Sequence, residues 1–279
     1  MNKSYKNFDD DVVNDFGNQW EKYNYDEIFG FNKLAFNEYF SIFPKKFLNN
    51  EAIGFDAGCG SGRWANFIAP KVKKLYCIEP SKKAIEVAKQ NLIKYENCVF
   101  ECATINTSTI KPREMDFGYC LGVLHHIPNT LSAMKSCTSK LKPGAPFLVY
   151  IYYKFDNKPI WYKYLWIFSN LLRKMICILP FKLKLLLSRI IAIFIYFPLA
   201  RFSFILNKFG IENNNLPLYE YRNKRFYVML TDSLDRFGTK LEKRFTKKEI
   251  KKMMQDSGLE NISFSANAPY WVGIGYKKD

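Results

Sequence analysis

Histidine, paired cysteine and acidic side chains are scarce in this chain of 279 residues. Only two histidines are present, and they stand next to each other at His125 and His126. The seven cysteines are spread singly with no C-x-x-C pair, which argues against a zinc site or a disulfide framework. We therefore expect small, buried cysteines in a reducing compartment, and no metal ion.

A leader segment and a long uninterrupted apolar run are also missing. Residues 1–11 are polar and acidic, unlike a secretory signal peptide. A membrane-spanning helix needs about 18 or more consecutive apolar residues. The longest uncharged run in the apolar part of the chain is only 190–200. These two features predict a cytoplasmic protein that does not span a membrane.

Basic side chains, in contrast, are abundant. Lysine and arginine number 42 against 26 acidic residues, a net charge of +16 that favours an anionic partner. Nucleic acid, a membrane surface and a phosphorylated substrate all fit that charge. With 48% hydrophobic residues the chain can bury a full core. Its length predicts one large domain, or one domain with a substantial insertion.

The stretch I-G-F-D-A-G-C-G-S-G-R-W at 53–64 predicts a strand, a glycine turn and the start of a helix. Glycines at 58, 60 and 62 allow positive φ and let a ligand come close to the backbone. The following helix, expected over 64–69, directs free N–H groups toward that ligand. Asp56 adds a negative charge, which suits an ammonium group and not a pyrophosphate.

The spacing of these glycines separates two classes of nucleotide-binding turn. The dinucleotide pattern G-x-G-x-x-G needs a third glycine where this chain has Arg63. The pattern D-x-G-x-G-x-G instead resembles the first motif of class I S-adenosylmethionine (SAM)-dependent methyltransferases. That resemblance implies that Asp56, Gly58, Cys59, Gly60 and Gly62 contact the methionine part of SAM. A glycine turn without a ligand is the alternative.

Two further segments extend the implied cofactor site. A second strand over 75–79 ends in Glu79, which lies 21 residues after Gly58 and could accept both ribose hydroxyls of NAD or SAM. A solvated strand-end carboxylate is the alternative for Glu79. A third strand over 99–103 carries Cys102 where the resembled family often has an acid that bonds adenine. This departure leaves the adenine to the backbone or to nearby residues, among them Ala103, Thr104 and Asn106.

The string L-G-V-L-H-H-I-P at 121–128 follows a fourth strand and resembles the corresponding motif of small-molecule methyltransferases. The resemblance places Leu121 and Gly122 beside the cofactor. A histidine there could act as general base on a hydroxyl or thiol acceptor, because its pKa is near neutrality. Packing and backbone bonding are the alternative for His125 and His126. We expect the two adjacent rings to point in different directions, so that at most one faces the acceptor.

Other elements complete an α/β fold, a Rossmann-like seven-stranded methyltransferase sheet. A helix over 130–141 leads to a fifth strand over 147–152. A capping box from Thr246 to Glu249 opens a helix that runs to Gly258, and the last two strands are expected over 262–265 and 271–276. A helical cap over 1–48 includes a helix over 29–43 that Pro44 ends. The SAM-binding core is then 49–153 with 245–279, and the resemblance covers 50–152 and 245–277.

The excursion over 154–244 is too long for a plain connection and predicts a helical insertion after the fifth strand. Between 154 and 210, ten basic residues stand against the single acid Asp156. Such basic, aromatic, amphipathic helices suit a peripheral membrane contact through 159–209. They equally suit a lid over the substrate or a cap that packs on a second subunit of a homo-oligomer.

The acceptor site is the least defined part of the prediction. The F-G-x-Q-W segment at 16–20 resembles one in a subgroup of these methyltransferases, and packing on the sheet is its alternative. Residues 219–237 are dense in Tyr, Arg and Asp, as in a polar pocket wall. A surface network of ion pairs would look the same. The acceptor-binding residues we expect are Gln19, Trp20, Tyr152, Tyr221, Arg225 and Tyr227.

These motifs together predict an enzyme that transfers a methyl group from SAM to an O, N or S atom of a small acceptor, amphiphilic or anionic. A nicotinamide-dependent oxidoreductase is disfavoured by Asp56 and Arg63. A nucleic-acid methyltransferase with a basic surface is disfavoured because the [ND]-P-P-[YF] motif for a flipped base is missing. A non-catalytic scaffold for membrane docking or assembly would not need all three glycines.

Overall fold

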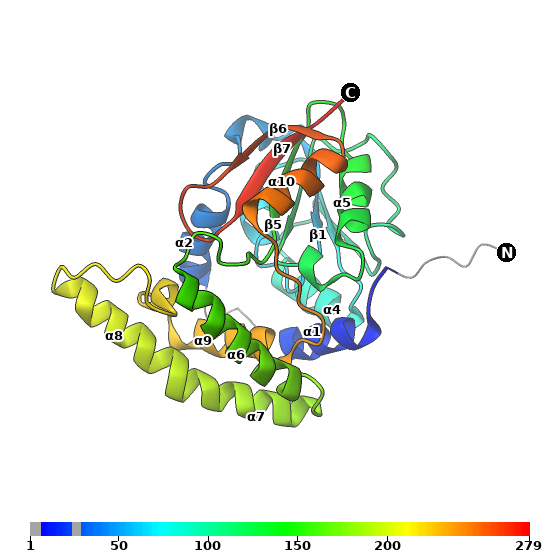
Figure 1. The fold of residues 1–279 in the computed structure, drawn as a ribbon. Helices are drawn as coiled ribbons and strands as arrows, with labels where there is room; N and C mark the ends of the chain where they lie inside the picture. The colour runs from blue at the N-terminus through cyan, green and yellow to red at the C-terminus, as the bar shows by residue number, and fades with distance from the viewer. Residues whose placement is uncertain (1–6, 24–28) are drawn as a thin grey trace. The chain divides into compact units, whose positions relative to one another are not determined.

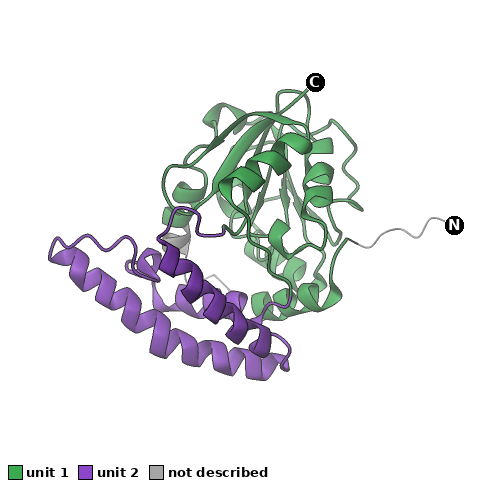
Figure 2. Cartoon of the chain, in the orientation of Figure 1, with its two compact units in different colours: residues 1–153, 241–279 green, residues 154–240 purple. Residues whose placement is uncertain are grey.

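The computed structural model describes residues 7–23 and 29–279, which form two compact units (Figure 2). The first unit comprises 1–153 and 241–279, and the second comprises 154–240. The second unit ends four residues before the insertion boundary expected at 244. The difference arises because Lys243 N–H and Phe245 N–H donate to the carbonyls of His125 and Tyr152, at 3.0 and 2.9 Å. Residues 241–245 therefore belong to the first unit.

A mixed sheet forms the centre of the first unit (Figure 1). Its order, in the part of the chain described, is β3-β2-β1-β4-β5-β7-β6, with β7 antiparallel to both neighbours and the other pairings parallel. The strands are β1 (Ile53–Ala57), β2 (Lys74–Ile78), β3 (Cys98–Glu101), β4 (Phe117–Leu121), β5 (Pro146–Tyr150), β6 (Leu259–Phe264) and β7 (Val272–Lys277). This confirms the predicted Rossmann-like methyltransferase sheet. The order in which successive strands are added to the sheet reverses between β1 and β4, the position where open α/β sheets bind their ligands.

Helices cover both faces of the sheet, and each face has its own apolar core. One core includes Phe36 of α2, Ile68 of α3 and Ile85 of α4. The other includes Met134 of α5 and Met254 of α10. The helices of this unit are α1 (Asp10–Lys22), α2 (Phe29–Tyr39), α3 (Ala65–Ile68), α4 (Lys82–Asn91), α5 (Thr130–Ser139) and α10 (Lys247–Asp256), with 3-10 turns η2 (Lys45–Phe47), η3 (Ala69–Lys71) and η4 (Leu124–His126). Helix α1 packs against α4.

Local signals in the sequence located several helix ends correctly. Thr246 and Glu249 form the predicted capping box of α10, and Ser81 is the N-cap of α4. The helix expected over 29–43 is too long, because α2 ends at Tyr39. Beyond it, Phe43 N–H donates to the Phe40 carbonyl at 3.0 Å, a three-residue turn that tightens the chain ahead of Pro44.

The second unit is helical. It contains α6 (Ile160–Ile176), α7 (Phe181–Ile191), the π-helical turn η5 (Ala192–Tyr196), α8 (Phe197–Lys208), the 3-10 turn η6 (Tyr219–Tyr221) and α9 (Phe226–Gly238). Prolines 159 and 180 precede α6 and α7, where their missing N–H costs no helical hydrogen bond. Helix α9 packs against both α6 and α7. A small core includes Ile176, Tyr196 and Met229.

Helices α7 and α8 join through η5 into one continuous helix of 28 residues, Phe181–Lys208. By length and composition alone this helix could cross a membrane; among the described residues it is the one helix of which that is true. The sequence expectation that the insertion does not span a membrane stays a prediction. The π turn ends two residues before Pro198, which has no N–H to offer to a regular α-helix.

Candidate functional site: a glycine turn and a histidine pair at the switch point

The glycine turn is tied to the neighbouring strand by its own backbone. The N–H groups of Gly58 and Cys59 both donate to the carbonyl of Ile78 at the end of β2, at 2.8 and 3.1 Å. The three glycines have φ of +77°, +54° and +78°, values that a side chain would strain. The sequence prediction of positive φ at Gly58, Gly60 and Gly62 is confirmed.

Neighbouring side chains leave no room for a Cβ on this turn. A Cβ on Gly58 would lie 2.5 Å from Cγ2 of Val123, which follows β4. A Cβ on Gly60 would lie 3.0 Å from Nε1 of Trp20 in α1. Trp20, expected to contact the acceptor, therefore lies against the cofactor turn. Its neighbour Gln19 is buried, and the acceptor roles of both residues stay predictions.

Glu79 is the residue that connects the turn to β2. Its Oε2 accepts a hydrogen bond from Gly60 N–H at 3.1 Å, and its Oε1 accepts one from Ser81 N–H at 3.0 Å. The residue is 8% exposed, which excludes the solvated strand-end carboxylate. Burial raises the pKa of the Glu79 carboxyl to about 7, against the effect of the two backbone donors. Each oxygen keeps a second lone pair for a ribose hydroxyl, a role that stays a prediction.

Asp56 is a buried carboxylate with unmet bonding capacity. It is 1% exposed, and its Oδ2 has no hydrogen-bond partner within residues 7–23 and 29–279. Burial raises the pKa of Asp56 to about 8; Tyr119 opposes the shift, Glu79 adds to it, and Arg63 opposes it. A buried acceptor in this state favours a bound cation or hydrogen-bond donor. The observation fits the ammonium group of SAM.

The residues after β3 are held by local hydrogen bonds. Ala103 N–H donates to the carbonyl of Glu79 at 3.2 Å, which fixes this segment beside the end of β2. Thr104 bonds Thr107 Oγ1 through its N–H at 3.1 Å and its hydroxyl at 3.0 Å. Cys102 is exposed, with its Sγ on the carbonyl of Pro80. Adenine contacts by Ala103 and Thr104 therefore stay predictions. Since the Thr104 side chain already bonds Thr107, backbone groups are the better candidates for these contacts.

Space lies open at the end of β4. Gly122 has φ of +79°, and a Cβ built on it would meet no atom within 4 Å. Its N–H donates to the carbonyl of Tyr150 in β5 at 3.0 Å, while Leu121 is buried. Gly122 thus borders an open region directly before the histidine pair. Its part in cofactor binding, and that of Leu121, stays a prediction.

The two histidines lie in η4 and form a cluster with Tyr152. Their ring centroids are 4.0 Å apart, and the Tyr152 ring stacks on His125 with a centroid distance of 3.7 Å. The Phe16 ring of α1 lies 4.9 Å from that of His126. The Tyr152 ring packs against both histidine rings, which are tilted by 52° to each other. The expectation that the rings point in different directions, with at most one facing the acceptor, stays a prediction.

Hydrogen bonds distinguish the two histidines chemically. His126 Nδ1 lies 2.6 Å from the carbonyl of Leu241, so Nδ1 carries the proton and Nε2 of the neutral ring carries the lone pair. His125 Nδ1 accepts the N–H of Tyr152 at 3.4 Å, so its proton is on Nε2. Burial, with His126 and Arg244 adding to it, holds the pKa of His125 well below its usual value. One ring therefore offers a base and the other a donor.

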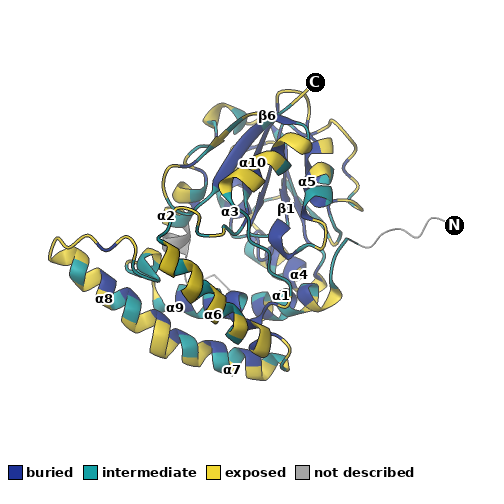
Figure 3. Ribbon diagram, viewed as in Figure 1, coloured by how far each residue is buried: buried dark blue, intermediate teal, exposed yellow. Residues whose placement is uncertain are grey.

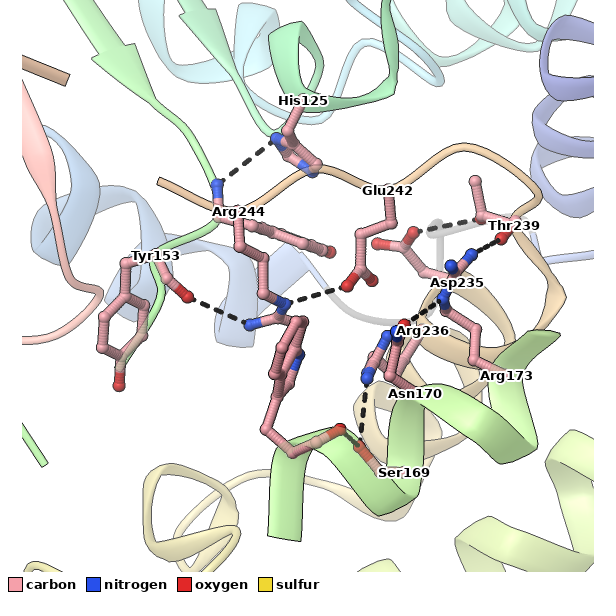
Figure 4. A network of polar contacts seen from close by, with 12 residues as sticks. His125, Tyr153, Ser169, Asn170, Arg173, Asp235, Arg236, Thr239, Glu242 and Arg244 are labelled. Carbon is pink, nitrogen blue, oxygen red and sulfur yellow. Dashed lines mark hydrogen bonds and ion pairs between the residues drawn. The ribbon is translucent and has the colours of Figure 1, made fainter. Parts of the chain in front are cut away.

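Sequence reasoning missed an ion pair next to this cluster (Figure 4). Arg244 Nε lies 2.8 Å from Glu242 Oε1, and the guanidinium lies 5.1 Å from the centroid of the Tyr152 ring. Arg244 Nη1 also donates to the carbonyl of Tyr153 at 3.3 Å. No motif marks these residues, since they precede the capping box in a short charged stretch. The pair holds Tyr152, and through it the imidazole of His125.

The other predicted acceptor residues belong to the second unit. Tyr221 in η6 donates its hydroxyl to Asp232 Oδ2 at 2.9 Å, and its ring meets Tyr196 edge-on at 5.3 Å. Arg225 is the N-cap of α9, and Tyr227 lies in its first turn. Their roles as acceptor ligands stay predictions. Among the described residues no group of three or more His, Cys, Asp or Glu could hold a metal ion.

Comparison with known proteins shows which proteins the part of the chain around this site is similar to. Residues 55–149 match the methyltransferase domain family. The chain is 32% identical over 97 residues to the ubiquinone biosynthesis O-methyltransferase of Nitrosomonas europaea, and 30% over 114 residues to that of Haemophilus ducreyi. These matches cover 34% and 38% of this chain. The chain spans 41% and 45% of the length of these two relatives.

Solved structures agree on the fold. A SAM-dependent methyltransferase of Thermotoga maritima aligns with a TM-score of 0.50 at 16% identity, over 95% of this chain and all of that one. A Haloferax volcanii complex of a methyltransferase with the Trm112 activator gives 0.55 at 10% identity, over 95% and 98% of the two chains. The chain thus has the fold of class I SAM-dependent methyltransferases, and residues 55–149 resemble a methyltransferase domain. The cofactor of such domains is SAM, which the geometry of Asp56 and the glycine turn fits.

Proposed function

We propose that this protein transfers a methyl group from SAM to the hydroxyl oxygen of a small, amphiphilic acceptor. The observation that carries the proposal is the histidine pair, whose lone pair and donor lie together after β4, at the switch point of the sheet. The ubiquinone biosynthesis O-methyltransferases that the core resembles favour oxygen over nitrogen or sulfur.

Two sets of residues would share the work. Asp56 and the glycine turn hold the cofactor, which supplies an electrophilic methyl group on a sulfonium when bound. His126 Nε2 takes the proton of the acceptor hydroxyl as the new C–O bond forms and the S–CH₃ bond breaks. The carbonyl of Leu241 holds Nδ1–H of His126 and stabilises the imidazolium that results. His125 Nε2–H, which is buried and has no partner among the described residues, donates to the acceptor oxygen and orients it.

Cofactor binding is tested first, by calorimetric titration with SAM, its demethylated product and NAD. Wild-type protein should bind SAM and product and not NAD, and Asp56→Ala and Glu79→Ala should lose that binding. Glu86→Ala is the matched control, since Glu86 is an exposed acid on α4 paired with Lys89. Binding of NAD instead of SAM would overturn the assignment.

The histidine roles are tested by methyl transfer from labelled SAM to phenols with alkyl tails. His126→Asn should lower kcat by about 10²–10⁴-fold with SAM affinity unchanged, because the base is lost. His125→Asn should act mainly on KM for the acceptor. The proposed roles would be refuted if both variants changed kcat and KM to the same extent. Methyl transfer to RNA in place of small hydroxyl compounds would refute them as well.

A further inference from the structure

Helix α6 has its polar and apolar sides reversed relative to a helix that packs in water. An exposed apolar stripe recurs every three to four residues along it: Ile160, Tyr164, Ile167, Phe168, Leu171 and Met175. The opposite side contacts α9 and the chain after it (Figure 4). Next to Leu172 and Ile176, which pack in the small core, it carries the polar residues Ser169, Asn170 and Arg173. Arg173 Nη1 donates to the carbonyls of Thr239 and Lys240 at 2.8 and 3.0 Å, and Arg236 Nη2 donates to Ser169 Oγ at 3.0 Å.

The continuous helix Phe181–Lys208 shows the same reversal. Apart from Tyr196, its buried positions are small or polar, among them Ser188, Ala192, Ala200 and Ser203. Ser233 of α9 donates its hydroxyl to the carbonyl of Ser188 at 3.0 Å. Exposed positions follow the helix along its length (Figure 3). The large apolar side chains among them are those of Leu186, Ile190, Ile193, Phe194, Phe197 and Phe202.

This arrangement is the reverse of what water favours. A surface helix in water buries its apolar side and exposes its polar side. In lipid, helices pack through small residues and hydrogen-bonding side chains, and they direct large apolar residues outward. Phe194 alone leaves 70% of its surface exposed, and the residues of both stripes are 40% or more exposed. Contiguous exposed apolar surface of this kind marks an interaction site.

Charge identifies the partner. Exposed basic side chains accompany the apolar stripes on both helices: Lys163, Lys174, Lys182, Arg189 and Lys208. Between 154 and 210 the only acid is Asp156. A protein partner would need a matching acidic rim, and a second copy of this unit would bring the same positive charges together. Anionic lipid head groups attract each of these basic residues, and the acyl chains below the head groups accept the apolar stripes.

We infer that the second unit docks in the plane of an anionic lipid bilayer, with the outward faces of α6 and of the Phe181–Lys208 helix inserted below the head groups. An in-plane position follows from the charges on the long helix. The uncharged run between Arg189 and Arg201 covers about 17 Å of helix, less than the roughly 30 Å of a hydrocarbon core. Arg189 is exposed, and Arg201 donates to the carbonyls of Arg222 and Lys224.

Vesicle co-sedimentation of the full-length protein tests this inference. Wild-type protein should bind phosphatidylcholine vesicles that contain phosphatidylglycerol, bind pure phosphatidylcholine more weakly, and be released by alkaline carbonate. The double variant Phe168→Ser/Phe194→Ser should weaken binding about a hundredfold or more, since two large apolar side chains leave the lipid. Lys174→Gln/Arg189→Gln should weaken binding to the anionic vesicles only.

The matched control is Ile93→Ser, because Ile93 is an equally exposed apolar residue (84%) in the first unit. It should leave vesicle binding unchanged. SAM titration and thermal unfolding of every variant show that the core is intact, so a failure here is separate from a failure of the proposed methyl transfer. Absence of vesicle binding, carbonate-resistant insertion, or a lipid-free dimer that the Phe168/Phe194 variant dissociates would each overturn the inference.

Discussion

The Gly60 amide donates a 3.1 Å hydrogen bond to Glu79 Oε2, so the glycine turn after β1 is fastened to the carboxylate at the end of β2. The second oxygen of Glu79 accepts a hydrogen bond from the N–H of Ser81, which is the N-cap residue of α4. One buried side chain therefore positions both the cofactor turn and the helix that follows the neighbouring strand. A residue expected to bind ribose is also part of the frame that shapes the site.

Replacing Glu79 with Gln should disturb both roles, and the two effects can be measured separately. Both oxygens accept backbone N–H groups, so an amide NH₂ would face a donor on one side. We expect a loss of about 1–3 kcal/mol in the free energy of unfolding, and SAM binding weakened by tenfold or more. Denaturant unfolding and calorimetry measure the two effects. Glu86→Gln should cost less than about 0.5 kcal/mol, as exposed ion pairs do; an equal cost in both variants would contradict the structural role of Glu79.

Asp56 should make the ligand-free protein less stable as pH rises. Its folded pKa of about 8 is above the ordinary value of 3.8, so the folded state binds the extra proton between these values. The free energy of unfolding attributable to Asp56 then falls as pH rises from about 4 to 8. In Asp56→Asn this fall should be reduced, and its Tm relative to wild type should increase toward pH 8. Parallel Tm profiles for the two proteins would rule out a buried, protonated Asp56.

The same carboxyl should couple SAM binding to proton release. A cationic group beside Asp56 lowers its pKa, so binding near pH 7 releases the proton that the ligand-free protein holds. SAM affinity should rise between about pH 6 and 8, by at most tenfold per pH unit, and then level off. Calorimetry in two buffers of different ionisation enthalpy measures the released proton. In Asp56→Asn, the pH dependence of SAM affinity that remains comes from the ligand and from Glu79. An unchanged slope of affinity against pH would exclude Asp56 as the source of the released proton.

Gly60 and Gly144 offer a matched pair for the turn. Both have positive φ, +54° and +73°, but a Cβ meets Trp20 at 3.0 Å in the first case and nothing within 4 Å in the second. Gly144→Ala should therefore cost only backbone strain, about 1–2 kcal/mol, with SAM binding intact. Gly60→Ala should add displacement of Trp20 and lower SAM affinity by tenfold or more. Full SAM affinity in Gly60→Ala would show that the ligand does not approach this turn.

Local patterns in the sequence were sufficient for the sheet, the glycine turn and the helix caps. Three glycines after an apolar strand permit the positive φ angles of the turn that follows it. A Thr-x-x-Glu sequence caps the helix that it begins. The histidine pair was found through its motif, yet the aromatic ring that packs on it was not. That ring belongs to Tyr152, which is 26 residues beyond His126 in the chain and is brought to it by the pairing of β4 with β5.

Taken alone, the amino-acid order determined the class of fold and the chemistry of the cofactor turn, because both follow from contacts between residues close in sequence. Tertiary structure decided which histidine carries a lone pair, since Leu241 and Tyr152 set the tautomers from distant parts of the chain. It also decided the meaning of the insertion. The sequence shows a basic and apolar segment, but only the packing of α6 and α7 on α9 shows which large apolar side chains remain exposed on the outer sides of these helices.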